Sequence, residues 1–116
     1  MKETGDKGEQ IVIDYFKKEG IRTMKGGHKA GYDLKAGNKL IEVKSTNQSK
    51  KQKSFFNLTE NEFFTACKNK NYWVYWVNVS EKKIILKISR DEMLKNIKPY
   101  SHYALYLTEL KKKIKD

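Results

Sequence analysis

Cysteine, histidine and proline are all scarce in this chain, with one cysteine, two histidines and one proline among 116 residues. A single cysteine, Cys67, excludes an internal disulfide and any zinc site built on several thiolates. Two histidines, His28 and His102, are too few for a histidine-rich metal centre. Cys67 falls among apolar residues of a predicted helix, so we expect it to be a small buried side chain.

Long apolar runs are also missing. No stretch approaches the ~18 consecutive apolar residues that a membrane-spanning helix needs. The N-terminal residues Met1–Asp6 lack the apolar segment of a secretory signal peptide. The chain has no internal repeat and no recognisable linker, and its length suits one domain. We therefore expect a single cytoplasmic domain, residues 1–116, with no membrane partner.

Arginine is nearly absent, since Arg22 and Arg90 are the only two, yet the chain is strongly basic. Lysine and arginine together number 25 against 14 acids, which gives a net charge of +11 at pH 7. Such an excess indicates a polyanionic partner, most often nucleic acid. An anionic membrane surface and a lysine bias inherited from the genome are the alternatives.

The stretch 31–45 organises the rest of the chain. Two short alternating runs flank Gly37-Asn38, and this pair favours a two-residue hairpin loop because both residues tolerate positive φ. The resulting register places Leu34 opposite Ile41, with both side chains directed into a core.

The same register places Asp33 opposite Glu42, with Lys44 on the face of Glu42. Like charges at directly opposed positions destabilise a strand pair. A divalent cation between the two carboxylates would remove that penalty, and hard oxygen ligands suit Mg²⁺ or Mn²⁺. Lys44 would then neutralise a phosphate or activate a water. The alternative interpretation is the solvated, charged face of an ordinary hairpin.

Periodicity and capping signals predict the remaining elements. In chain order we expect a helix over 7–19, a short strand over 21–24, the hairpin over 32–45, a helix from Thr59 to about Asn69, strands over 72–79 and 83–88, and a helix opened by Ser89 and stopped by Pro99. This order predicts an α/β fold with a mixed central sheet flanked by helices. The apolar run 72–79 is expected at the centre of that sheet.

Two of the predicted helical segments carry further signals. Thr59 and Glu62 have the spacing of a capping box, which is a sufficient structural reason for Glu62. In the same helix Phe63, Phe64 and Cys67 are expected to point inward. The C-terminal residues fit a helical stripe, and we expect a helix there, with an edge strand over 102–108 as the alternative.

Asp33 followed by Glu42-Val43-Lys44 on the next strand resembles the core motif of the PD-(D/E)XK nuclease superfamily, with Tyr32 in place of the motif's proline. More narrowly, the chain resembles the NO VEIN C-terminal-like domain over about residues 5–90. The segments that carry this resemblance are Gly8-Glu9, Gly31-Tyr32-Asp33, Ile41-Glu42-Val43-Lys44-Ser45, Leu58-Thr59-x-Asn61-Glu62 and the aromatic strand 72–77.

The resemblance implies a restriction-endonuclease-like core with a C-terminal helical extension over about residues 91–116. It implies that Asp33, Glu42 and the Val43 carbonyl hold Mg²⁺ or Mn²⁺, and that Lys44 orients the attacking water. Glu9 matches an acid that the first helix of this superfamily often carries. A favourable interaction with the helix dipole is the alternative reason for Glu9.

Two polar, basic loops adjoin the motif, over 25–31 and 45–54. The first is glycine-rich and is expected to be flexible, with His28 as an exposed loop residue. Their lysines are expected to contact nucleic-acid phosphates, although solvated loops are also commonly basic. The residues concerned are Lys29, Lys50, Lys51 and Lys53.

The hypothesis that follows is a metal-dependent nuclease of restriction or repair type, with DNA as the favoured substrate and a homodimer as a common form of such enzymes. The alternative is a catalytically inactive, nuclease-like module that binds nucleic acid within a larger assembly. A lysine-rich protein-interaction domain is a third, weaker hypothesis.

Overall fold

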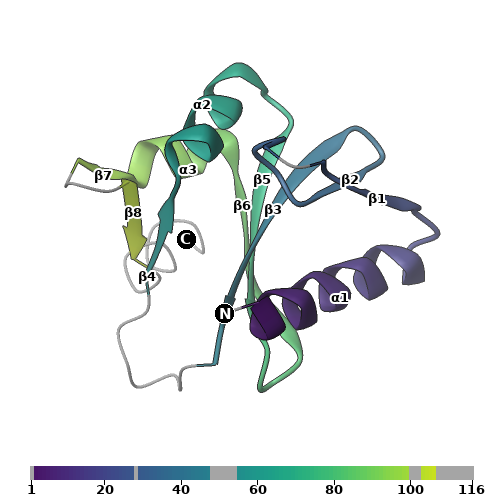
Figure 1. Ribbon diagram of the computed structural model, residues 1–116. Coiled ribbons are helices and arrows are strands. Elements are labelled where there is room, and N and C mark those ends of the chain that lie inside the picture. The colour runs from purple at the N-terminus through teal and green to yellow at the C-terminus, as the bar shows by residue number, and fades with distance from the viewer. Residues whose placement is uncertain (1, 28, 48–54, 100–102, 107–116) are drawn as a thin grey trace.

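The computed structural model describes residues 2–27, 29–47, 55–99 and 103–106. Its elements follow the predicted order closely (Figure 1). They are α1 (Lys2–Lys18), β1 (Thr23–Lys25), β2 (Leu34–Ala36), β3 (Lys39–Thr46), β4 (Phe55–Leu58), α2 (Glu60–Lys68), β5 (Tyr72–Asn78), β6 (Lys83–Ser89), α3 (Arg90–Asn96), β7 (Lys98–Pro99) and β8 (Tyr103–Tyr106). Helix α1 begins before the predicted residue 7, so Gly8 and Glu9 lie inside the helix.

The main sheet has five strands in the order β1-β2-β3-β5-β6. Strands β3 and β5 are parallel, and every other neighbouring pair is antiparallel. The mixed sheet predicted from the sequence is therefore confirmed. The connection between the two parallel strands carries α2, as parallel pairing requires a crossover.

Helices cover both faces of this sheet (Figure 1). Helix α1 packs on one face, and α2 and α3 lie on the other. Alternation along β5 divides its side chains between two cores. On the α1 side the buried cluster is Val12, Phe16, Leu34, Ala36, Ile41, Val43, Tyr75 and Val77. On the other side it is Leu58, Ala66, Tyr72, Val74, Trp76, Ile88 and Met93.

The hairpin register is the predicted one. Leu34 pairs with Ile41 and Ala36 with Lys39 across the Gly37-Asn38 turn, and Gly37 has φ +61°. Leu34 and Ile41 are fully buried. Because register decides which face each side chain occupies, Glu42 and Lys44 are fixed on the α2 face of β3.

The buried face of α2 differs from the predicted one. Ala66 is fully buried, whereas Phe64 is 48% exposed and Cys67 is exposed. The apolar pattern favoured the aromatic residues as the inward set, but the helix turns its small side chain toward the sheet. The expectation of a buried Cys67 is therefore wrong.

The C-terminal part also differs from the predicted helical extension over 91–116. Helix α3 ends at Asn96, and the backbone then forms β7 and β8. Strand β8 pairs with both β4 and β7 in a second, three-stranded sheet. The helix prediction is wrong over 98–99 and 103–106, where extended structure is correct, and residues 107–116 lie outside the described residues.

Among the described residues, no helix combines the length and the apolar character that crossing a bilayer requires.

Candidate active site

Strand β3 presents the two central charged residues of the site to the α2 face of the sheet. The Glu42 side chain is only 6% exposed, and Lys44 lies two positions further along the same face. The Lys44 Nζ atom is 3.3 Å from Glu42 Oε2. The sequence predicted this juxtaposition, because Ile41 and Val43 occupy the opposite, apolar face.

Asp33 lies just before β2, where the paired register ends at Leu34 and Ile41, so the directly opposed Asp33–Glu42 pair that the sequence predicted is not part of the ladder. Its backbone N–H donates to the Ile41 carbonyl at 2.9 Å. Its Oδ2 atom accepts a 2.8 Å hydrogen bond from the Val43 N–H, so the carboxylate is tied to the edge of β3. The N–H and C=O of one strand residue point to the same edge. The Val43 carbonyl is therefore directed toward the side on which Asp33 lies.

The environment strongly disfavours ionisation of Glu42. Burial raises the pKa of Glu42 to about 10, with the attraction of Lys44 opposing burial and repulsion from Asp33 and Glu62 adding to it. Burial also raises the pKa of Asp33, although hydrogen bonds from the Val43 N–H and the Glu42 carboxyl counteract part of this rise. Both carboxyl groups therefore favour their protonated forms more than a solvent-exposed carboxyl does.

Glu62, in the first turn of α2, is the third carboxylate at this place. Its Oε1 atom is 2.9 Å from Lys44 Nζ. Burial would raise the pKa of Glu62, but the Lys44 charge and the hydrogen bonds from Lys44 and the Thr59 N–H outweigh burial and lower it. Glu62 is therefore the ionised partner of Lys44.

Lys44 keeps its proton despite being largely buried. Burial lowers the pKa of Lys44, yet the charges of Glu42 and Glu62 outweigh burial and the net shift is upward. At neutral pH Lys44 is an ammonium ion. This favours an electrostatic role for Lys44 over that of a general base.

Glu9 approaches the same carboxylates from α1. Burial raises the pKa of Glu9, and repulsion from Asp33 adds to the rise. Lys25 of β1 opposes this shift, with its Nζ atom 3.6 Å from Glu9 Oε1. The helix thus brings Glu9 within electrostatic range of Asp33.

Two residues at the end of the glycine-rich segment, Lys29 and Gly31, are hydrogen-bonded to neighbouring elements. The Asn61 side chain donates to the Lys29 carbonyl at 3.1 Å, and the Tyr72 hydroxyl donates to the Gly31 carbonyl at 2.8 Å. Gly31 has φ +82°, and a Cβ there would lie 2.0 Å from Thr65 Oγ1. The end of this segment is thus anchored to α2 and β5 immediately before Asp33.

Among the lysines predicted to contact phosphate, Lys29 has an exposed side chain beside this site. The other three, Lys50, Lys51 and Lys53, lie outside the described residues, as does His28. Their expected role stays a prediction.

The donor set fits a divalent cation held by two carboxylates. A cation beside Asp33 and Glu42 would offset the unfavourable burial of their charges and remove the repulsion between the two ionised groups. Within the described part of the chain no group of three or more His, Cys, Asp or Glu residues is arranged to hold an ion. Mg²⁺ does not require one, because it is commonly bound through one or two carboxylates, with water and substrate phosphate as further ligands.

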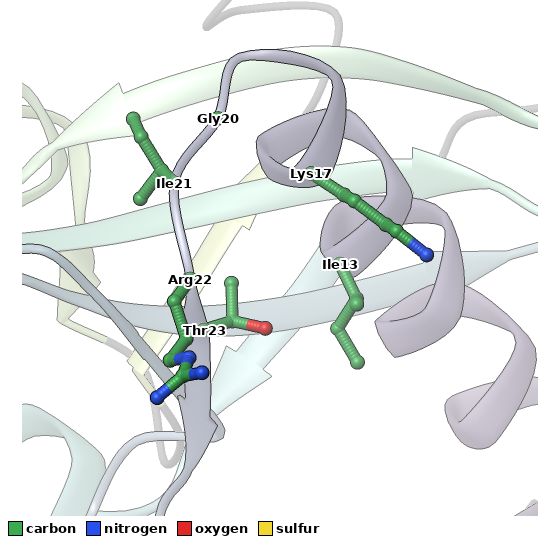
Figure 2. Close-up of a pocket in the computed structure, with 6 residues that line it drawn as sticks. All are labelled: Ile13, Lys17, Gly20, Ile21, Arg22 and Thr23. Carbon is green, nitrogen blue, oxygen red and sulfur yellow. The ribbon is translucent and has the colours of Figure 1, made fainter.

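A separate hollow of about 380 Å³ lies between the C-terminal half of α1 and the start of β1 (Figure 2). Its lining is Ile13, Lys17, Gly20, Ile21, Arg22 and Thr23. None of these residues belongs to the carboxylate site, so the hollow is distinct from the place where the charged groups converge.

The sequence interpretation missed Glu62 as a site residue. The capping box, which is present, accounted for it locally. Only the crossover from β3 through α2 to β5 brings that cap over Lys44. The motif around Asn61-Glu62 was the signal that could have indicated its place.

Comparisons with known proteins agree with this geometry. The family model described as Protein NO VEIN, C-terminal, matches residues 8–89, which contain every described residue of the site. A bacterial homing endonuclease, I-Ssp6803I, has a similar structure, with a TM-score of 0.66 and 18% sequence identity over 92% of this chain and 74% of that chain. The likeness shows a shared nuclease-like fold. No match was found among curated proteins.

Proposed function

Since this chain belongs to the family described as Protein NO VEIN, C-terminal, we propose that it is a metal-dependent nuclease that hydrolyses phosphodiester bonds. The observation that carries the proposal is the convergence of Asp33, Glu42 and Lys44 at one edge of β3. Two carboxylates for a cation and one ammonium for a phosphate are the groups that this hydrolysis needs.

We propose Asp33, Glu42 and the Val43 carbonyl as ligands of Mg²⁺ or Mn²⁺. When bound, the ion would polarise the phosphoryl oxygen and lower the pKa of a ligated water. The protein's own contribution is to fix the ligands. Asp33 is held by the Val43 N–H, and Glu42 is held by burial on a central strand of the sheet.

Lys44 supplies positive charge where negative charge accumulates during hydrolysis. As an ammonium it stabilises the phosphorane oxygens and orients the attacking water. Glu9 assists from α1 by orienting water on the Asp33 side. These roles are consistent with the pKa directions of Lys44 and Glu9.

We propose DNA as the substrate, with the +11 net charge as support. Lys29 and the lysines over 50–53 are the proposed phosphate contacts. A homodimer would place two such sites on the two strands of a duplex, and a cytoplasmic location suits access to DNA.

The test is cleavage of plasmid DNA in Mg²⁺ or Mn²⁺, with chelator added as a reference. Lys44→Met and Asp33→Asn are each expected to reduce kcat by about 10²-fold or more, the loss typical of removing one stabilising group. Lys35→Met is the matched control, because Lys35 is exposed on β2 of the same hairpin.

Equal cleavage by wild type and both site variants would mean that the activity is a contaminant and would refute the proposal. Salt-dependent binding without cleavage in any divalent ion would instead identify a nuclease-like binding module.

A further inference from the structure

The Glu62 carboxylate joins two parts of the molecule through one oxygen atom. Glu62 Oε1 accepts from the Thr59 N–H at 3.0 Å and from Lys44 Nζ at 2.9 Å. In return the Glu62 N–H donates to Thr59 Oγ1 at 3.1 Å. The capping box therefore fixes the carboxylate in place, and the fixed carboxylate holds the ammonium of Lys44.

The cap alone does not explain the charge of Glu62. Glutamine serves a capping box as well as glutamate does. A third carboxylate beside Asp33 and Glu42 adds repulsion to a pair that is already crowded, and it raises the pKa of Glu42 further. A fold that needed only the cap would gain stability from glutamine. The charge is thus retained for its contact with Lys44.

Lys44 has a particular need for such a partner. Its ammonium sits on a flexible four-carbon stem, and a productive geometry requires the head group to be held. Glu42 also contacts it, with Lys44 Nζ 3.3 Å from Glu42 Oε2, but Glu42 is a proposed metal ligand. Glu62 offers an ionised, immobilised carboxylate that has no such second role.

We infer that Glu62 is a positioning residue that holds the Lys44 ammonium in place for phosphodiester hydrolysis, with the backbone N–H of Thr59 as the support of its carboxylate. This inference rests on the proposed nuclease function and adds a fifth side chain to Asp33, Glu42, Lys44 and Glu9 at the same site. The chemistry needs no new reactant, because Glu62 neither bonds to substrate nor transfers a proton.

The kinetic test compares Glu62→Gln with Thr59→Ala. Glu62→Gln keeps the capping hydrogen bond and removes the charge, so kcat should fall about 10- to 100-fold with KM changed less than about twofold. Thr59→Ala weakens the cap but keeps the Thr59 N–H and the Glu62 charge, so kcat should stay within about threefold of wild type. In a Lys44→Met background, Glu62→Gln should change kcat by less than about threefold.

Two kinetic results would overturn the inference. Equal losses of kcat in Glu62→Gln and Thr59→Ala would show that Glu62 acts only as a helix cap. A higher Mg²⁺ requirement with unchanged kcat at saturating metal would make Glu62 a metal ligand instead.

A second readout needs no activity. The folding equilibrium constant is measured by urea denaturation for wild type, Glu62→Gln, Lys44→Met and the double variant. The effect of Glu62→Gln should differ at least about fivefold between the two backgrounds, with Glu62 more favourable when Lys44 is present. A difference below about twofold would overturn the inference. If the wild type cuts no DNA in any divalent ion, the proposed function fails. The coupling between Glu62 and Lys44 in the folding equilibrium then still tests whether Glu62 holds the Lys44 ammonium.

Discussion

Glu42 is a buried carboxyl at the centre of the candidate site. It is 5% exposed, and its environment favours the neutral form. Burying a charge without full compensation costs several kcal/mol. A residue chosen for stability at this position would be apolar or neutral, so the carboxyl points to a ligand that is not part of the chain.

The first prediction concerns the pH dependence of stability. The folded pKa of Glu42 is raised from 4.5 to about 10. The folded protein therefore binds more protons than the unfolded chain between these values, and stability falls as pH rises through that window. Glu42→Gln cannot titrate, so it should be more stable than wild type at pH 8 by about 1–3 kcal/mol.

Urea denaturation at pH 5 and pH 8 measures this difference. The advantage of Glu42→Gln should be smaller at pH 5, where less of the penalty on wild type has developed. A variant that is less stable than wild type at both pH values would show that the carboxylate is well compensated in the fold, contrary to this account.

Among single residues, the sequence predicted the positions that are set by the local pairing of the hairpin strands. Glu42 and Lys44 lie on one face of β3 by the alternation of side chains, and the two-residue turn brings Asp33, which directly precedes β2, beside them. Glu62 escaped prediction because it lies 18 positions beyond Lys44 in the chain, and no local rule places α2 over β3. Its capping role explained the residue locally, so its contact with Lys44 was not predicted.

Helix α1 packs closely against β3 at Gly8. A Cβ at Gly8 would lie 1.9 Å from Ser45 Oγ and 3.1 Å from Ser45 Cβ. Only glycine permits α1 to approach β3 this closely. The approach sets the position of Glu9, the next residue, relative to Asp33.

The second prediction tests this close contact. Gly8→Ala should destabilise the fold by about 1–3 kcal/mol, because the helix must move away from β3. Gly5→Ala is the matched control within the same helix. No atom lies within 4 Å of a Cβ built at Gly5, so this change should stabilise the fold by about 0.5–1 kcal/mol through helix propensity.

Thermal denaturation of both variants measures the contrast. The Ser45 Oγ atom is buried and has no hydrogen-bond partner within the described residues. Adding Ser45→Ala to Gly8→Ala should therefore recover part of the loss. If the two glycine variants change stability equally, the helix does not depend on the close contact.

Among the elements, those set by short-range signals were predicted best. The Gly37-Asn38 turn and the two N-terminal caps fixed the hairpin, α2 and α3. The three-stranded sheet was not predicted, because β4 pairs with β8 from a distant part of the chain, although the alternation over 102–108 had offered an edge strand as the alternative at β8. The inward face of α2 was also mispredicted, since the bulky Phe64 outweighed Ala66 in the apolar pattern.

For the whole molecule the dominant property is charge. A net charge of +11 on 116 residues creates a field that attracts any polyanion. Such binding releases counterions, so affinity falls steeply with salt. The lysines nearest the carboxylates should then matter more than those elsewhere.

The third prediction compares two lysines. Lys29→Gln should weaken DNA binding uniformly across sequences and reduce the slope of log affinity against log salt by about 1. Lys18→Gln removes the same charge from an exposed position at the C-terminal end of α1, and it should change the slope by much less. Fluorescence anisotropy over a range of salt concentrations measures both. Identical slopes for the two variants would argue against a phosphate contact at Lys29.

Every proposed role of the site residues depends on a cation held between Asp33 and Glu42. The most direct measurement is anomalous X-ray scattering from crystals soaked in Mn²⁺. The account predicts one strong peak about 2.1 Å from a carboxylate oxygen of each of the two residues, and its loss in Asp33→Asn crystals. A saturating soak that leaves this position empty would contradict it.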